Sequence, residues 1–142
     1  MKVVYPITVE IDEDGWHIVH VPDLGQYTQG EDLVDALFMA EDLISLTCLT
    51  YTEKKIELPE PTPLYKLSQS DGVINTLIRA DIDAYKIKLD KSAVRKNLTI
   101  PNWLNEKAEK AQINFSQVLQ EALKEILQVE EYHPINHQGK KT

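Results

Sequence analysis

The sequence predicts an α+β protein made of two small domains, and two patterns lead to this fold class. Near the N-terminus, apolar and polar side chains alternate with the period of two that is typical of a half-buried strand. Further on, apolar residues recur three and four positions apart, as in amphipathic helices. The 142 residues suffice for two small domains. We therefore expect a β-β-β-α-β domain at 1–88, a linker at 89–93, a strand and two helices at 94–130, and a frayed tail at 131–142.

The N-terminal domain is expected to open with a hairpin. Apolar residues occupy the odd positions from Val3 to Ile11, and the tight-turn pair Asp14-Gly15 separates them from the β-branched and aromatic run Trp16–Val21. A short polar stretch before Gly30 adds a third strand. Apolar side chains at helical spacing then predict one helix, and a later apolar run predicts a fourth strand. The expected strands are residues 3–11, 16–21, 26–29 and 73–80, and the expected helix covers about 31–51.

The charge of the chain is divided unevenly along its length. The net charge of −8 taken alone argues against a nucleic-acid partner. However, residues 1–53 contain one basic and eleven acidic residues, a net charge of −10, whereas residues 91–112 contain five basic and two acidic residues, a net charge of +3. Each segment is either a binding surface or a solvated face whose composition drifts by chance, and the charge alone does not decide between them.

Composition excludes several classes of protein. The single Cys48 cannot form an internal disulfide or a cysteine-based metal site. No stretch approaches the ~18 consecutive apolar residues of a membrane helix, and no apolar signal-peptide core follows the start. We therefore expect a cytoplasmic protein with no membrane partner. Neither a cofactor nor a metal ion is expected.

The C-terminal segment is expected to dimerise. One short strand and two helices cannot bury a core or pair the strand's own edge. A second copy is the simplest partner, because strand 95–100 can pair with its two-fold mate while the helices contribute a broad apolar stripe. The expected dimer core consists of Leu98, Ile100, Leu104, Phe115, Val118, Leu119 and Leu123.

Three polar side chains on the outer face of the paired strands are candidate base readers. Because side chains alternate along a strand, Arg95, Asn97 and Thr99 point together away from the helices. Arginine can bridge guanine, asparagine can bridge adenine and threonine can contact the thymine methyl group, all from a ribbon narrow enough for the major groove. Backbone N–H groups at the start of the second helix can bind phosphate. The expected phosphate contacts are Lys96, Asn114, Phe115, Ser116 and Gln117, of which Asn114 and Gln117 also form a capping box.

Residues 94–128 resemble the ribbon-helix-helix family of DNA-binding proteins, which includes the Arc and MetJ-like repressors. The resemblance depends on the motif RKNLTIP followed by INFSQVLQEAL. Two positions depart from the family pattern. Lys96 stands where an apolar residue is usual, and Gln112 stands where glycine is frequent, so a left-handed conformation there costs ~1 kcal/mol more than with glycine. A dimer that never binds DNA remains the alternative.

The segment YPITVEIDEDGWHIVHVPDLGQYTQGEDLVDAL resembles the front half of HicB antitoxins, and the combined resemblance runs from about Tyr5 to Leu127. It implies a HicB-like domain with a partial ribonuclease H-like fold. It also implies a toxin partner, HicA, a small basic RNA-cleaving protein whose catalytic histidine HicB covers. A basic toxin surface should recognise the acidic segment 1–53. The candidate toxin-binding acids are Asp12, Glu13, Asp14 and Asp23.

These resemblances predict an antitoxin that is not an enzyme. We expect it to inhibit a HicA-like RNA-cleaving toxin and to repress its own operon by binding a palindromic operator. It would act as a homodimer through its C-terminal domain, and its complex with toxin would be a heterotetramer or larger.

A metal-dependent nuclease is the least favoured alternative. In a ribonuclease H relative, Glu10, Glu41 and Asp81 would have to gather around two metal ions. Glu10, however, alternates with strand residues that face the helix, and Glu41 lies off the apolar stripe of the helix. The histidines form no better metal site, because one pair lies on opposite faces of a strand and the other lies in the frayed tail; these pairs are His17 with His20 and His133 with His137.

Overall fold

The computed structural model describes residues 1–137, which form two compact units. The first unit consists of residues 1–90 together with residues 134–137, and the second consists of Lys91–His133.

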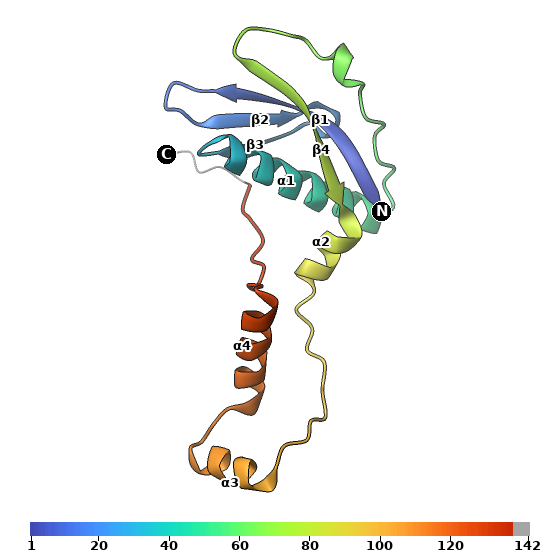
Figure 1. The fold of residues 1–142 in the computed structure, drawn as a ribbon. Helices are drawn as coiled ribbons and strands as arrows, with labels where there is room; N and C mark the ends of the chain where they lie inside the picture. The colour runs from blue at the N-terminus through green and yellow to red at the C-terminus, as the bar shows by residue number, and fades with distance from the viewer. Residues whose placement is uncertain (138–142) are drawn as a thin grey trace. The chain divides into compact units, whose positions relative to one another are not determined.

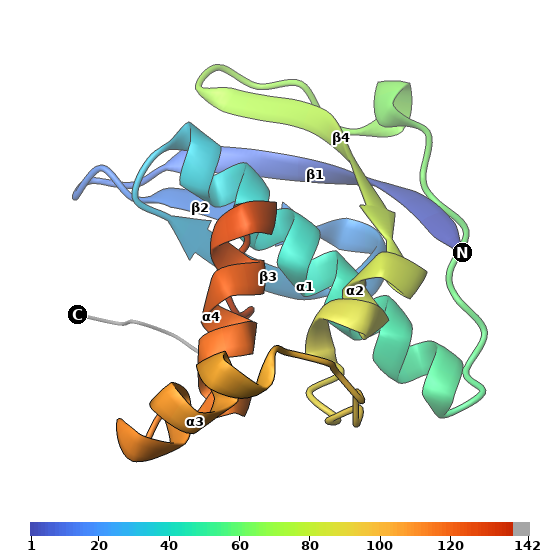
Figure 2. The ribbon, with the colours of Figure 1, turned by 60° about the horizontal axis from the view of Figure 1, so that its bottom comes forward.

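A four-stranded antiparallel sheet forms the framework of the first unit (Figure 1). Its strands are β1 (Lys2–Ile11), β2 (His17–Val21), β3 (Gln26–Gly30) and β4 (Val73–Asp81), in the spatial order β3-β2-β1-β4. Helices α1 (Leu33–Glu53) and α2 (Ile82–Leu89) cover one face of this sheet (Figure 2). The predicted strands and the long helix are therefore present.

The core lies between the odd positions of β1 and helix α1. Tyr5, Ile7 and Val9 are buried, as their alternation predicts, and α1 contributes Ile44 and Cys48 to the same core. Even positions of β1 face the other side of the sheet. The period-two pattern thus identifies the face of β1 that packs against the helix.

Helix α1 begins two residues later than predicted because Asp32 caps it. The Asp32 side chain accepts a hydrogen bond from Asp35 N at 2.8 Å, and Asp35 in turn accepts one from Glu31 N at 2.9 Å. These three acids therefore organise the start of the helix, where negative charge also favours the helix dipole.

Helix α2 is an element that the sequence analysis missed. Asp81 caps it by accepting a hydrogen bond from Ala84 N at 3.1 Å. Ile82 and Tyr85 of this helix are buried in the core of the first unit. Residues expected at the end of the domain and in its linker are thus helical as far as Leu89.

The proline-rich connection after α1 has no regular secondary structure as far as Pro63 and is fixed at two places. The Tyr5 hydroxyl donates to Pro59 O at 2.7 Å. Thr62 donates its N–H and its hydroxyl to the two carboxylate oxygens of Asp23, at 3.0 and 2.6 Å. The connection then forms a short 3-10 helix, Leu64–Lys66, that packs against β4.

The second unit contains helices α3 (Asn102–Lys110) and α4 (Phe115–Leu127). Residues 91–101 have no regular hydrogen-bonded structure in the single chain. The strand expected at 95–100 is therefore not formed here, and its pairing with a second copy stays a prediction. Gln112 adopts the left-handed conformation with φ of 55°, at the position where the related motif frequently has glycine.

Candidate functional site

The second unit exposes nearly all of its apolar side chains. Between Lys91 and His133 no residue is buried, although α4 carries large apolar side chains on one side. Val118 is 50% exposed and Ile126 is 76% exposed. Burying one such side chain fully is worth about 1.5–3 kcal/mol, so this face gains most from a partner surface. The predicted dimer-core residues Leu98, Ile100, Leu104, Phe115, Val118 and Leu123 are all exposed here, and Leu119 is half-buried.

The three candidate base readers lie on the exposed segment before α3. Arg95, Asn97 and Thr99 are all exposed, as is Lys96 between them. Their common orientation on one ribbon face depends on strand pairing that a single chain cannot supply. The structure therefore leaves these side chains accessible without bringing them together.

The predicted capping box at the start of α4 is only half formed. Asn114 Oδ1 accepts a hydrogen bond from Gln117 N at 3.1 Å. The Gln117 side chain, however, donates to Glu121 Oε1 at 3.2 Å instead of turning back to Asn114. Of the three predicted phosphate-binding N–H groups, that of Gln117 is consequently used by the cap, whereas those of Phe115 and Ser116 belong to the first turn, which has no acceptor within the helix.

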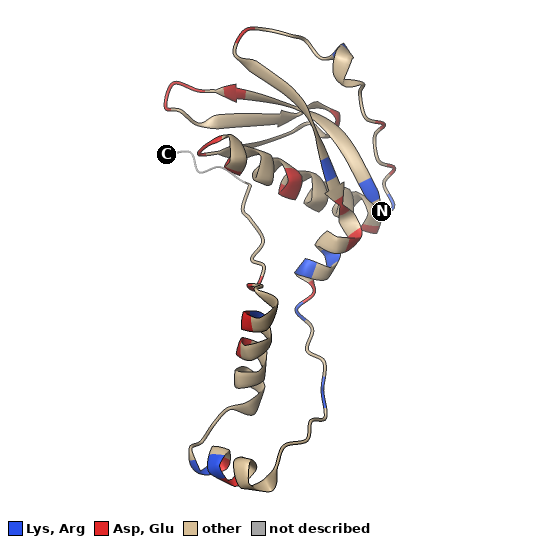
Figure 3. Cartoon of the chain, in the orientation of Figure 1, with Lys and Arg blue, Asp and Glu red and all other residues tan. Residues whose placement is uncertain are grey.

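Helix α3 places both of its lysines on the side of Trp103. Trp103, Lys107 and Lys110 follow one another at helical spacing, and the Lys107 ammonium lies 5.7 Å from the centre of the Trp103 ring. Glu106 lies four positions before Lys110 and so neighbours it on the helix surface, whereas Glu109 lies further round the helix. Figure 3 shows basic residues of this unit on α3 and the preceding segment, and Lys124 adds one on α4.

Two groups of acidic residues in the first unit lie at the β1–β2 turn and at the start of α1 (Figure 3). At the turn, Asp12 Oδ1 accepts hydrogen bonds from Asp14 N at 2.9 Å and Trp16 N at 2.8 Å, which fixes the hairpin. Glu13 and Asp14 are exposed. Asp12 is exposed as well, whereas Asp23 is half-buried.

Asp23 has a structural role that the sequence analysis missed. Both of its carboxylate oxygens are engaged by Thr62, which lies 39 positions further along the chain. No local pattern identifies such a long-range contact. The side chain therefore anchors the connection after α1.

The carboxylates weighed for a nuclease site do not gather. Glu10 and Glu41 are exposed, and Asp81 caps α2. Within residues 1–137 no group of three or more histidines, cysteines or acids is placed to hold a metal ion. His20 instead stacks on Tyr27, with ring centres 4.2 Å apart.

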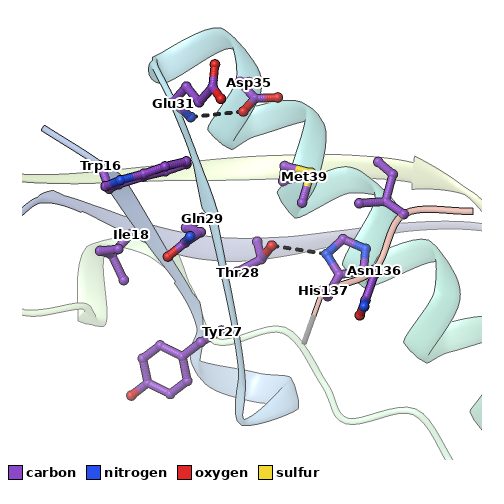
Figure 4. A pocket seen from close by; sticks show the side chains of 11 residues that line it. Trp16, Ile18, Tyr27, Thr28, Gln29, Glu31, Asp35, Met39, Asn136 and His137 are labelled. Atoms are coloured by element: carbon purple, nitrogen blue, oxygen red, sulfur yellow. Dashed lines mark hydrogen bonds between the residues drawn. The ribbon is translucent and has the colours of Figure 1, made fainter. Parts of the chain in front are cut away.

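A cluster that the sequence analysis did not predict lies between β3, α1 and the end of the described chain. His137 approaches Thr28 and Asp42 with its two ring nitrogens. Of the tail predicted to fray at 131–142, residues 138–142 lie outside the described residues. Beside it is a pocket of about 570 Å³ whose walls include Trp16, Met39 and Asn136 (Figure 4).

The fold and its surfaces define a class of protein: an acidic α+β domain joined to a small helical unit that leaves its apolar face open. A family model described as "HicB_like antitoxin of bacterial toxin-antitoxin system" matches residues 5–126. The chain therefore belongs to this antitoxin family.

Several solved structures are similar to the chain, among them the following two. One is a chain of a toxin-antitoxin complex from Streptococcus pneumoniae, which is 28% identical, with a TM-score of 0.56 and coverage of 88% of this chain and 99% of that one. The other is the antitoxin HicB of Burkholderia pseudomallei, which shares the fold at 24% identity, with a TM-score of 0.50 and coverage of 88% and 98%. Among curated protein sequences, none matches the chain. Within the part of the chain that the structure describes, no helix is long and apolar enough to cross a membrane.

Proposed function

We propose that this antitoxin inhibits a HicA-like RNA-cleaving toxin through its N-terminal unit and represses its own operon through its C-terminal unit. The observation that carries this proposal is the division of charge within one chain, −10 over residues 1–53 and +3 over residues 91–112, in a member of an antitoxin family. A basic RNA-cleaving protein and DNA phosphates are partners of opposite charge, and each fits one of the two segments.

The toxin-binding part of the proposal is supported by the accessible acids of the first unit. Glu13 and Asp14 project from the β1–β2 turn, and no lysine or arginine occurs between Lys2 and Lys54 to compensate them. Complementary charge accelerates the encounter of two proteins and disfavours wrong partners. The similar chain from Streptococcus pneumoniae belongs to a toxin-antitoxin complex.

The DNA-binding part of the proposal is supported by the open apolar face of the second unit and by its exposed polar segment. Pairing of two copies through residues 95–100 would bury Leu98 and Ile100, which are 67% and 42% exposed in the single chain. It would also align Arg95, Asn97 and Thr99 on one outer face. A ribbon of this kind enters the major groove, and the phosphate contacts at the start of α4 fix its position.

The experiment that tests both parts uses the full-length Asn97→Ala variant with the toxin from the adjacent reading frame and duplex DNA from upstream of the gene. Loss of a bidentate base contact should weaken specific operator binding by about 1–3 kcal/mol while toxin inhibition is unchanged. The matched control is Asn105→Ala on α3, which should leave operator binding unchanged. Equal weakening of specific and non-specific DNA binding would contradict base reading by Asn97.

The alternative from another class is a protein-interaction module that dimerises without binding DNA. The same open apolar face favours it, because dimerisation alone is enough to bury that face. A wild-type dimer that inhibits the toxin but fails to shift the upstream duplex at low salt would establish this alternative.

A further inference from the structure

The last described residue of the chain is held firmly in the first unit. His137 Nδ1 lies 3.0 Å from the Thr28 hydroxyl on β3 (Figure 4). His137 Nε2 lies 2.5 Å from the Asp42 carboxylate on α1. The side chains of His137 and Asp42 are only 8% and 4% exposed. One imidazole ring therefore connects three separate segments of the chain.

The buried carboxylate of Asp42 requires a hydrogen-bonding partner. Asp42 stands in α1 directly before the buried residues Leu43 and Ile44, where an apolar side chain would be the ordinary choice. A buried carboxylate is costly unless charged or hydrogen-bonding groups surround it, and removing one partner costs more than it does at the surface. His137 supplies one such group from a distance of 95 residues.

The docked segment also forms one side of the pocket beside it. Ile135, Asn136 and His137 line the pocket from the tail, and Trp16, Tyr27 and Met39 line it from the domain. Docking therefore covers side chains of the domain besides the two that contact His137.

The second unit is bridged between its own ends. Lys91 Nζ lies 3.2 Å from Glu131 Oε1, and this ion pair holds the pKa of Glu131 below its usual range. The chain leaves the first unit at Asp90 and returns to it at Pro134. The helical unit is consequently an insertion with two attachments. The family match ends at residue 126, so the returning segment lies outside it.

We propose that residues 134–137 are a C-terminal latch that fastens the far end of the helical unit to the N-terminal unit of the same chain. In this latch, the His137 side chain makes the contact, and Thr28 and Asp42 form the site that holds it. A second attachment removes much of the freedom that a single flexible linker leaves, because both ends of the inserted segment are then fixed. The latch does not depend on the identity of either proposed partner.

Nitrogen-15 relaxation on the full-length protein tests the latch. In the wild type, the heteronuclear NOE values of residues 135–137 should match those of β3 and α1, whose side chains contact His137. His137→Ala should lower these values to those of a free tail, because the buried contacts are lost, and should make the tumbling of the two units more independent. The NOE values of β1 should stay unchanged.

His133→Ala is the matched control, since it makes the same change at an exposed histidine four positions earlier and should alter neither measurement. Thr28→Val removes the hydroxyl that contacts His137 and leaves the tail unchanged, at nearly constant side-chain volume. It should reproduce part of the His137→Ala effect. Low wild-type NOE values at 135–137, or release of the tail without any change in tumbling, would overturn the proposal. High NOE values that disappear on dilution would overturn attachment within one chain, because they would show that Thr28 and Asp42 hold the tail of a second copy.

Discussion

Asp23 shows how a single side chain can have a different role from the one its charge indicates. Its carboxylate binds both the N–H and the hydroxyl of Thr62 and so fixes the connection after α1. Hydrogen bonds to a charged group contribute about 1.5–3 kcal/mol each when partly buried. We expect Asp23→Ala to lower the free energy of unfolding by about 2 kcal/mol or more in urea titrations.

The control for this prediction is Asp14→Ala, which removes an exposed acid of the β1–β2 turn. Surface substitutions away from special features usually change stability by less than about 0.5 kcal/mol. Equal effects of the two substitutions would show that the Asp23–Thr62 contact contributes nothing particular to stability.

Cys48 is fully buried on the core side of α1, and burial raises the pKa of its thiol from 9.0 to about 11. Because the thiolate is the reactive form, we expect no reaction with a disulfide reagent at pH 8 in the native protein and complete reaction in urea. Because the folded-state pKa is raised, the thiol stabilises the native state below pH 9, and this stabilisation is lost as the pH rises from 9 towards 11. Rapid labelling under native conditions at pH 8 would contradict the burial.

Helices and strands could be predicted from the sequence where their periodic pattern of apolar residues is long enough. The strands and α1 were predicted because their alternation and helical spacing continue over many residues. Helix α2 was missed because it has eight residues, of which only Ile82 and Tyr85 are buried, so too little periodicity is present. The contact between His137 and Asp42 was missed because the two residues are 95 positions apart, and no local pattern connects them. The ribbon at 95–100 requires a partner strand, which one chain lacks.

Gly30 ends β3 where the chain turns closely under the first turn of α1. A Cβ atom at this position would lie 2.2 Å from Ala36 N, which is backbone and cannot move aside cheaply. We expect Gly30→Ala to lower the free energy of unfolding by about 3 kcal/mol or more, measured by urea denaturation, because overpacking forces the backbone to shift.

Gly72→Ala is the control that distinguishes the steric cost of an added Cβ atom from the cost of a left-handed backbone conformation. Gly72 has φ of 79° and open space around it, so its substitution should cost only the left-handed conformation, about 1 kcal/mol. A cost at Gly30 no larger than that at Gly72 would contradict the close approach between β3 and α1.

Helix α4 offers a direct test of the dimer that the proposed function requires. Val118 lies on its apolar side and is half exposed in the single chain, whereas Lys124 lies on the opposite side. Val118→Asp should convert the dimer to a monomer in analytical ultracentrifugation, because burying an unpaired carboxylate in the interface is costly. Lys124→Asp should leave the dimer intact, and a dimer that survives Val118→Asp would exclude this face as the interface.

At the scale of the whole molecule, the net charge of −8 describes neither of the two charged segments. The acidic N-terminal unit is proposed to meet a basic toxin, and complementary charge acts mainly on the rate of association. The double substitution Glu13→Lys with Asp14→Lys should therefore slow association with the toxin at low salt by about tenfold, with little change in the dissociation rate. The difference from wild type should shrink as salt rises, because the charges are then screened.

The matched control is Glu57→Lys with Glu60→Lys, which makes the same change in net charge on the exposed connection after α1. If the β1–β2 turn faces the toxin, the control should slow association much less than the turn variant does, because the attraction of the changed charges falls with distance. Stopped-flow kinetics over a range of salt concentrations measures both variants against wild type. Equal slowing by the two variants would mean that the association rate depends on the net charge of the chain. It would contradict the proposal that the β1–β2 turn contacts the toxin.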